Sequence, residues 1–124
     1  MKTILLVDDD RDILNYLELT LKSGGYKIIS ETDALSALCT IQKGINIDLV
    51  ITDYSMPGMD GHEFFNEVTK VLPSVPVIML TGHVSVENYL KSLSLGLYEY
   101  VSKPIDSTLL HRIVKSALDS SEAQ

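Results

Sequence analysis

Short apolar runs alternate with amphipathic stretches along the whole chain. Five runs rich in apolar and β-branched residues predict strands, at residues 4–7, 26–30, 47–53, 77–80 and 98–102. After each run, apolar residues recur every three or four positions, which is the pattern of a helix that packs on one side. These helices are expected at residues 11–23, 34–43, 61–71, 85–95 and 107–119.

Capping residues mark the ends of the predicted helices. Asp10, Asp33 and Asp106 can act as N-caps, because a carboxylate there accepts hydrogen bonds from the first free N–H groups. Glycines, which commonly end helices, follow the first, second and fourth helices at positions 24–25, 44 and 96. The apolar positions of the second helix are Leu35, Leu38, Cys39 and Ile41, and those of the third are Phe64, Phe65, Val68 and Val71.

Regular alternation of strands and helices predicts a parallel sheet with helices on both faces, joined by right-handed crossovers. The first, third and fourth strands are almost entirely apolar, so they belong inside the sheet. The second and fifth belong at its edges because they carry polar residues, namely Lys27, Ser30, Glu99 and Ser102. The result is an α/β, flavodoxin-like doubly wound fold with five parallel strands in the order 2-1-3-4-5 and five helices.

Length and composition add further bounds. The 124 residues suit one domain, expected at 1–120 with a frayed tail at 121–124. A net charge of -7 disfavours a nucleic-acid surface, which needs a basic face. No stretch approaches the ~20 apolar residues of a membrane-spanning helix, and the cytoplasm is the expected compartment. The single cysteine, Cys39, excludes an internal disulfide and is expected to lie half-buried on the second helix.

Reactive side chains follow four of the five strands. Asp8 and Asp9 follow the first strand, Asp53 ends the third, Thr81 follows the fourth and Lys103 follows the fifth. In a parallel sheet the carboxyl ends of all strands lie along one edge, and ligands bind where the strand order reverses. That point lies between the first and third strands here. The predicted order therefore gathers three carboxylates, a hydroxyl and an ammonium.

Each of these residues has a simpler explanation when taken alone. An Asp at a strand end usually forms a turn with its own backbone, and acids before a helix favour its dipole. Thr81, Lys103 and Tyr100 are ordinary residue types for strand ends and edge strands. Packing is the expected role of Met56 and Met59, and no metal-ligand spacing links the histidines His62, His83 and His111.

The combination at one edge favours phosphoryl chemistry over these explanations. Clustered carboxylates repel one another unless they bind a cation or take up protons, and an all-oxygen site with waters suits Mg²⁺. An ionised Asp53 can attack a phosphoryl group as a nucleophile. The metal and the Lys103 ammonium would offset charge on the phosphoryl oxygens, and Thr81 could donate a hydrogen bond to one of them.

The chain resembles two-component response-regulator receiver domains over essentially its whole length. The matching residues are Asp8-Asp9, Asp53 within the segment 53–61, Thr81-Gly82, Tyr100 and Lys103-Pro104. The resemblance implies that Asp53 is the phosphoacceptor and that Asp9, Asp53 and the Ser55 carbonyl bind Mg²⁺ directly, with Asp8 acting mainly through water. It also implies that Lys103 contacts the phosphoryl group and that the Lys103-Pro104 bond is cis.

The resemblance further implies a signalling function, with no enzymatic activity beyond self-phosphorylation and slow autodephosphorylation. The phosphoryl group would come from a histidine kinase or a histidine phosphotransfer protein. Phosphorylation would draw the Thr81 hydroxyl toward the phosphoryl group and let Tyr100 turn inward. The face made by the fourth helix, fifth strand and fifth helix would then change its contacts with a partner, an output domain or a second copy. No direct nucleic-acid or membrane contact is expected of this domain.

A few positions depart from the family pattern. Gly82 and Leu97 stand where alanine is common, and Ser55 and His83 occupy variable positions that tune dephosphorylation in this family. None of these changes removes a reactive residue, so a competent receiver is expected. The weak helix formers Asn88, Ser92 and Ser94 suit a fourth helix that rearranges.

Three other classes of protein fit the sequence less well. A haloacid-dehalogenase-like phosphohydrolase also forms an aspartyl-phosphate, but it would need a second Asp where this chain has Ser55. A flavin or nucleotide carrier would need a glycine-rich loop after the first or third strand. The complete reactive set argues against a phosphorylation-independent interaction domain. The sequence does not distinguish a protein that acts alone from a receiver excised from a larger regulator or hybrid kinase, and it names no cognate kinase.

Overall fold

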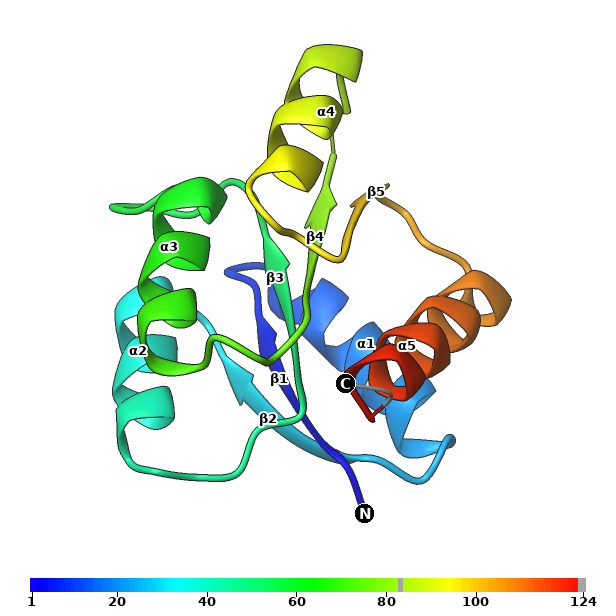
Figure 1. Cartoon of the computed structure of the whole chain (residues 1–124). Coiled ribbons are helices and arrows are strands. Elements are labelled where there is room, and N and C mark those ends of the chain that lie inside the picture. The colour runs from blue at the N-terminus through cyan, green and yellow to red at the C-terminus, as the bar shows by residue number, and fades with distance from the viewer. Residues whose placement is uncertain (83, 123–124) are drawn as a thin grey trace.

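The computed structural model describes residues 1–82 and 84–122. Within them, five strands alternate with five helices along the chain (Figure 1). The strands are β1 Thr3–Val7, β2 Lys27–Glu31, β3 Leu49–Asp53, β4 Val77–Thr81 and β5 Glu99–Ser102. The helices are α1 Arg11–Lys22, α2 Ala34–Gln42, α3 Gly61–Val71, α4 Val86–Ser94 and α5 Ser107–Glu122.

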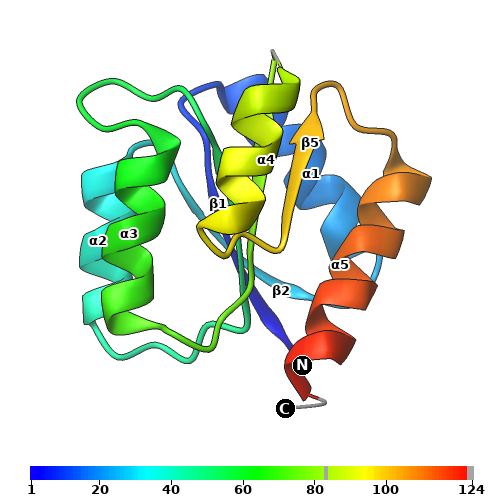
Figure 2. The same ribbon diagram turned by 45° about the horizontal axis from the view of Figure 1, so that its top comes forward.

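The strands form one parallel sheet in the order β2-β1-β3-β4-β5, which confirms the predicted order. Every residue of β1, β3 and β4 is buried, whereas β2 and β5 at the edges are only partly covered. The inner strands are apolar because helices cover both of their faces. Figure 2 shows α2 and α3 on one side of the sheet and α1 and α5 on the other.

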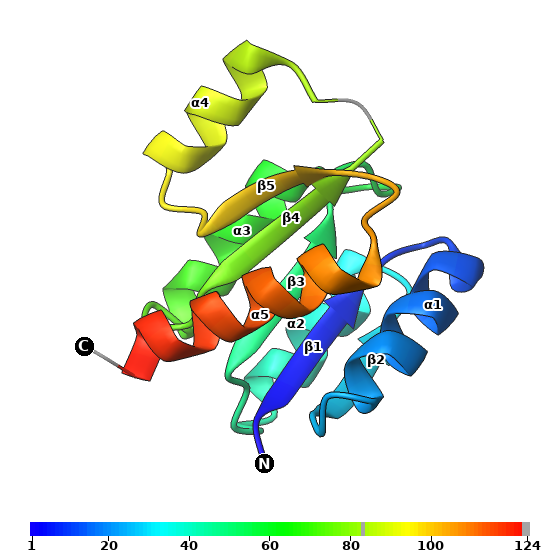
Figure 3. The ribbon, with the colours of Figure 1, turned by 90° about the vertical axis from the view of Figure 1, so that its right-hand side faces the viewer.

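Two hydrophobic cores lie on the two faces of the sheet. One contains the apolar sides of α2 and α3, with Phe64 fully buried, and the other contains those of α1 and α5, with Leu110 fully buried. Figure 3 shows α1 and α5 in front of the strands on the second face. Because helices cover both faces, the two ends of the sheet are left to the connecting loops.

The three aspartates predicted as N-caps do cap the helices that follow them. The Asp10 carboxylate accepts hydrogen bonds from the N–H groups of Asp12 and Ile13, and that of Asp33 accepts one from Ser36. The Asp106 carboxylate accepts one from the N–H group of Leu109 at 2.8 Å. The capped helix starts agree with the predicted boundaries, because a satisfied N–H group is a local requirement.

The buried face of α2 differs from the predicted one. Ala34, Ala37 and Ile41 are buried, whereas Leu35 is 69% exposed. Cys39 is exposed, and the prediction that it is half-buried is wrong. The reason is that Ala34, Ala37 and Ile41 share one helical face at three- and four-residue spacing, and this is the face that packs on the sheet. On α3, Val71 is 43% exposed and contributes less to the buried face than its apolar character predicts.

The carboxyl-terminal helix extends beyond its predicted end. α5 continues to Glu122, past the expected end of the domain at residue 120. Residues 123 and 124 of the predicted tail, and His83, lie outside the described residues, and the boundary at residue 120 stays a prediction. In the described part of the chain, no helix combines the length and apolarity that crossing a membrane requires.

Gly61 is packed so closely that there is no room for a larger residue. An added Cβ at Gly61 would lie 2.8 Å from both the Tyr54 Cα atom and the Met79 Cε atom. We expect Gly61→Ala to lower the free energy of unfolding by about 1–3 kcal/mol, as overpacking does. Urea unfolding followed by circular dichroism measures this change.

Gly82→Ala is the matched control, since a Cβ there has no neighbour within 4 Å. Its free energy of unfolding should change by no more than about 0.5 kcal/mol. Equal losses in the two variants would show that close packing at Gly61 is not the cause.

Candidate functional site

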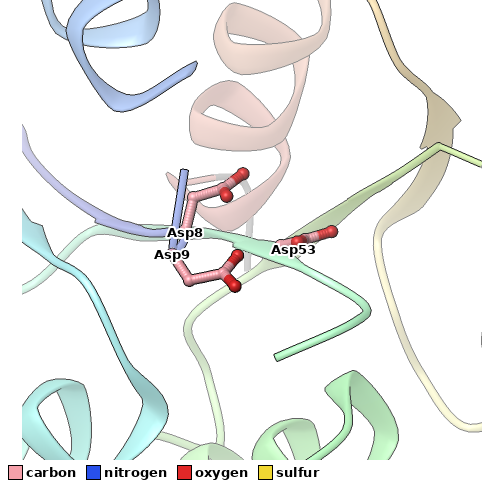
Figure 4. Close-up of side chains that lie close together, drawn as sticks. All are labelled: Asp8, Asp9 and Asp53. Atoms are coloured by element: carbon pink, nitrogen blue, oxygen red, sulfur yellow. The ribbon is translucent and has the colours of Figure 1, made fainter. Parts of the chain in front are cut away.

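The carboxylates of Asp8, Asp9 and Asp53 meet where β1 and β3 end. Val7 of β1 lies opposite Thr52 of β3, so the residues that follow them lie side by side. Asp8 and Asp53 are buried, with 2% and 7% of their surface exposed, and Asp9 is exposed. One oxygen from each of the three carboxylates lies within 4.8 Å of the others (Figure 4). This is the edge at which the sequence placed them.

Lys103 completes this group from the loop after β5. Its Nζ atom lies 2.8 Å from Asp8 Oδ2 and 3.2 Å from Asp53 Oδ1. The Lys103 N–H group donates to the Thr81 carbonyl at 2.7 Å, which continues the pairing of β4 with β5. The bond between Lys103 and Pro104 is cis, as the resemblance implied. Lys103 therefore reaches both carboxylates from a backbone that is held against β4.

Burial and charge shift the pKa values of this group. Burial raises the pKa of Asp53; the Lys103 ammonium opposes this increase, and the Asp8 carboxylate adds to it. Burial also disfavours the charge on Lys103, but the hydrogen bond to Asp8 and the attraction of Asp53 outweigh it and raise the pKa of Lys103. The ionised form of Asp53 is therefore disfavoured by burial and by the neighbouring Asp8 carboxylate. A bound cation would stabilise this ionised form.

The two oxygens of Asp8 already have partners. Oδ1 accepts a hydrogen bond from the Asp10 N–H group at 2.9 Å, and Oδ2 accepts one from Lys103. The Asp53 contact with Lys103 involves only Oδ1. Asp9 and Asp53 therefore offer oxygens for a metal more readily than Asp8 does.

The segment from Tyr54 to Asp60 forms the loop that follows Asp53. The Tyr54 N–H group donates to the Leu80 carbonyl at 3.0 Å, and the Gly61 N–H group closes the loop on the Tyr54 carbonyl at 2.6 Å. Asp60 caps α3, and Gly58 adopts a φ of 82°, which favours glycine. The Ser55 N–H group stabilises the ionised form of Asp53. Metal binding by the Ser55 carbonyl stays a prediction.

Thr81 ends β4 and Tyr100 lies in β5, where its ring packs against Tyr89 of α4. Thr81 is buried at the end of β4, and the Tyr100 ring is 3% exposed. The Tyr100 ring packs between those of Tyr54 and Tyr89, each at a centroid distance of 6.4 Å. Burial raises the pKa of Tyr100, and its hydroxyl has no hydrogen-bond partner among the described residues, although the Thr81 side chain approaches it. The roles of Thr81 and Tyr100 in a switch stay a prediction.

The sequence interpretation missed an apolar pocket beside Lys103. A cavity of about 630 Å³ lies between α1 and the loop after β5, lined by residues that include Ile13, Tyr16 and Pro104. The Tyr16 hydroxyl donates to the Ile105 carbonyl at 2.9 Å and so ties the two walls together. No local pattern could reveal this pocket, because its walls are 89 residues apart in the chain. The one available signal was Tyr16, an aromatic residue on the polar side of the α1 pattern.

Comparison with known proteins agrees with this geometry. Residues 4–115 match the family model of the response regulator receiver domain. The transcriptional regulatory protein GlrR of Escherichia coli is 36% identical over 118 residues, covering 95% of this chain and 26% of GlrR. The chain therefore spans about a quarter of the length of this curated relative.

Solved structures match almost the whole chain. A response regulator receiver domain protein from Clostridium thermocellum superposes with a TM-score of 0.92 at 29% identity, covering 99% of this chain and 98% of that one. The beryllofluoride-activated NtrC4 receiver domain dimer also gives a TM-score of 0.92 at 30% identity, with coverages of 98% and 99%. The flavodoxin-like architecture expected from the sequence is thus that of known receiver domains.

Proposed function

This chain belongs to the response regulator receiver family, and on that premise we propose that Asp53 is its phosphoacceptor. Receiver domains are signalling domains of two-component systems, and they interact with histidine kinases. The observation that carries the proposal is the meeting of Asp8, Asp9, Asp53 and Lys103 at one end of the sheet. Acetyl phosphate with Mg²⁺ should add a single phosphoryl group, located by mass spectrometry to the peptide that contains Asp53.

The donor set fits Mg²⁺, because three carboxylates supply only oxygen ligands and the exposed Asp9 leaves room for waters. Asp9 and Asp53 would hold the metal with the Ser55 carbonyl, and Asp8 would act through water, since its oxygens already bind Asp10 and Lys103. A bound Mg²⁺ would neutralise charge on the phosphoryl oxygens.

The chain's own residues then supply the remaining parts of the reaction. An Asp53 oxygen attacks phosphorus in line with the donor, the new O–P bond forms, and the N–P bond of the donor phosphohistidine breaks. The electron pair of that bond stays on the donor imidazole, which takes a proton from water. Lys103 stabilises the equatorial oxygens as a charge, and Thr81 donates a hydrogen bond to one of them. Hydrolysis of the acyl phosphate by water returns Asp53.

Signalling would follow from a change at the face made by α4, β5 and α5. Thr81 would move toward the phosphoryl group, and the space that it vacates would let Tyr100 turn inward. The two states differ in their affinity for the phosphoryl group, so phosphorylation shifts the population. This face would contact an output domain or a second copy, and the related NtrC4 receiver forms a dimer.

The donor and the setting complete the proposal. A sensor histidine kinase or a histidine phosphotransfer protein would supply the phosphoryl group in the cytoplasm. The domain itself would make no direct contact with nucleic acid or membrane. Its reactions would be self-phosphorylation and autodephosphorylation, without turnover of another substrate.

Removal of the proposed metal ligand Asp9 should weaken Mg²⁺ binding. We expect Asp9→Ala to raise the Kd for Mg²⁺ by about tenfold or more, because a direct carboxylate ligand is lost. Isothermal titration calorimetry measures this Kd. Asp12→Ala, which removes an exposed carboxylate from the first turn of α1, is the matched control. An equal effect of the two substitutions would reduce the role of Asp9 to general charge.

A further inference from the structure

Helix α4 is attached to the domain in an unusual way. Its outer face is apolar and exposed, with Val86 at 77% and Leu90 at 60%. Ser92 is the residue of this helix that is fully buried, at 0% exposure. A helix on a protein surface normally buries an apolar stripe. In α4 the fully buried position is instead a serine, in the last turn of the helix.

The Ser92 hydroxyl has its partner on α3. Ser92 Oγ lies 2.8 Å from the Nε2 atom of His62, which is itself 9% exposed. The His62 ring packs edge-on against Tyr54 at a centroid distance of 5.0 Å, and Tyr54 in turn contacts Tyr100. A buried polar group without a partner is costly. In the present position of α4, His62 and Ser92 therefore satisfy each other.

The surroundings of His62 favour its neutral form. Burial lowers the pKa of His62, the Lys91 ammonium on α4 lowers it further, and the Asp60 carboxylate at the start of α3 opposes them. If Nε2 accepts the hydrogen bond from the Ser92 hydroxyl, protonation turns Nε2 into a donor, so the hydroxyl must turn its own proton elsewhere and a charge lies in a buried site beside Lys91. If Nε2 donates, protonation of Nδ1 places a charge in a buried site beside Lys91. In both tautomers the charged ring fits the docked helix poorly.

We propose that the His62–Ser92 hydrogen bond is a latch that holds α4 on the domain while His62 is neutral and releases it when His62 takes up a proton. Release lets water reach the imidazolium, so opening of α4 binds a proton that the closed state does not. The latch responds to pH and does not depend on a phosphoryl group on Asp53. It would add proton sensitivity to the face on which a partner of the domain is expected to dock.

Amide hydrogen exchange of the whole chain between about pH 5 and pH 8 tests the latch. After correction for intrinsic exchange rates, opening of α4 should become more frequent as the pH falls below 6.5, approaching about tenfold per pH unit. The free energies of opening of α3 and the sheet should change much less. A pH-independent opening of α4 would overturn the proposal.

Matched variants separate His62 from the other titratable groups. His62→Gln keeps a hydrogen-bonding side chain that does not titrate, so the pH dependence of α4 opening should disappear. His111→Gln makes the same change on α5 and should behave as the wild type does. Loss of the pH dependence in both variants, or in neither, would contradict the latch.

Two further measurements keep the test decisive if His62→Gln does not fold. NMR titration of the wild type should give His62 a pKa below 6.5, and Ser92→Ala should raise opening of α4 at pH 8 while bringing the His62 pKa closer to 6.5. A His62 pKa above 6.5 in the wild type would overturn the proposal.

Discussion

Asp53→Asn should reduce phosphorylation by acetyl phosphate or by a kinase to background, at least about a hundredfold below wild type. The reason is that an amide oxygen lacks the charge with which a carboxylate attacks phosphorus. The substitution keeps the shape of a side chain that is 7% exposed, so the fold should persist. Incorporation of labelled phosphate, with circular dichroism as the check on folding, measures the effect.

Asp48→Asn is the matched control for this substitution. Asp48 precedes β3 and accepts a hydrogen bond from the Thr3 N–H group at 2.8 Å, at the opposite edge of the sheet. Asn can accept the same hydrogen bond, so labelling should equal that of the wild type. Labelling of Asp53→Asn at the wild-type level would disprove the phosphoacceptor role of Asp53.

Lys103→Met should change phosphorylation and Mg²⁺ affinity in opposite directions. Phosphorylation should slow by about a hundredfold, as when one stabilising donor is removed from a transition state. Mg²⁺ should bind several-fold more tightly, because the ammonium that lies 2.8 Å from Asp8 and 3.2 Å from Asp53 repels the metal. Initial rates of phosphorylation at saturating Mg²⁺ and calorimetric titration measure the two effects.

Lys70→Met is the control for loss of a lysine charge. Lys70 pairs with Glu67 on the exposed side of α3, away from the carboxylates. This pair is exposed, and its loss should leave both measurements unchanged. If Lys103→Met weakened Mg²⁺ binding instead, Lys103 would hold the carboxylates in place more than it repels the metal.

The phosphoacceptor site and the proposed latch meet at Tyr54. Its backbone follows Asp53, and its ring contacts both His62 and Tyr100. A change at Asp53 and a proton at His62 would therefore act on the same helix through adjacent side chains. The two effects concern different groups and can be measured separately. Phosphate labelling of Asp53→Asn tests the phosphoacceptor, and amide hydrogen exchange of His62→Gln tests the latch.

Much of this protein follows from its sequence because local patterns determine it. Alternating apolar runs and amphipathic stretches predicted the strands and helices, and the polar residues of β2 and β5 predicted the edges. In a parallel sheet, strand order dictates which strand ends are neighbours. The meeting of Asp8, Asp9, Asp53 and Lys103 could therefore be predicted without coordinates.

The tertiary structure alone shows which face of each helix is buried and which buried side chains contact one another, because these features depend on how the helices rotate and pack. Whether Leu35 or Ala34 faces the sheet is settled by the rotation of α2 about its own axis when it packs. The contact of His62 with Ser92 joins residues 30 positions apart on two helices, and no local pattern specifies their relative rotation. Local periodicity determines where the helices and strands lie in the sequence, and the polarity of the strands determines their order in the sheet. Side-chain packing between distant elements determines which buried polar groups become hydrogen-bond partners.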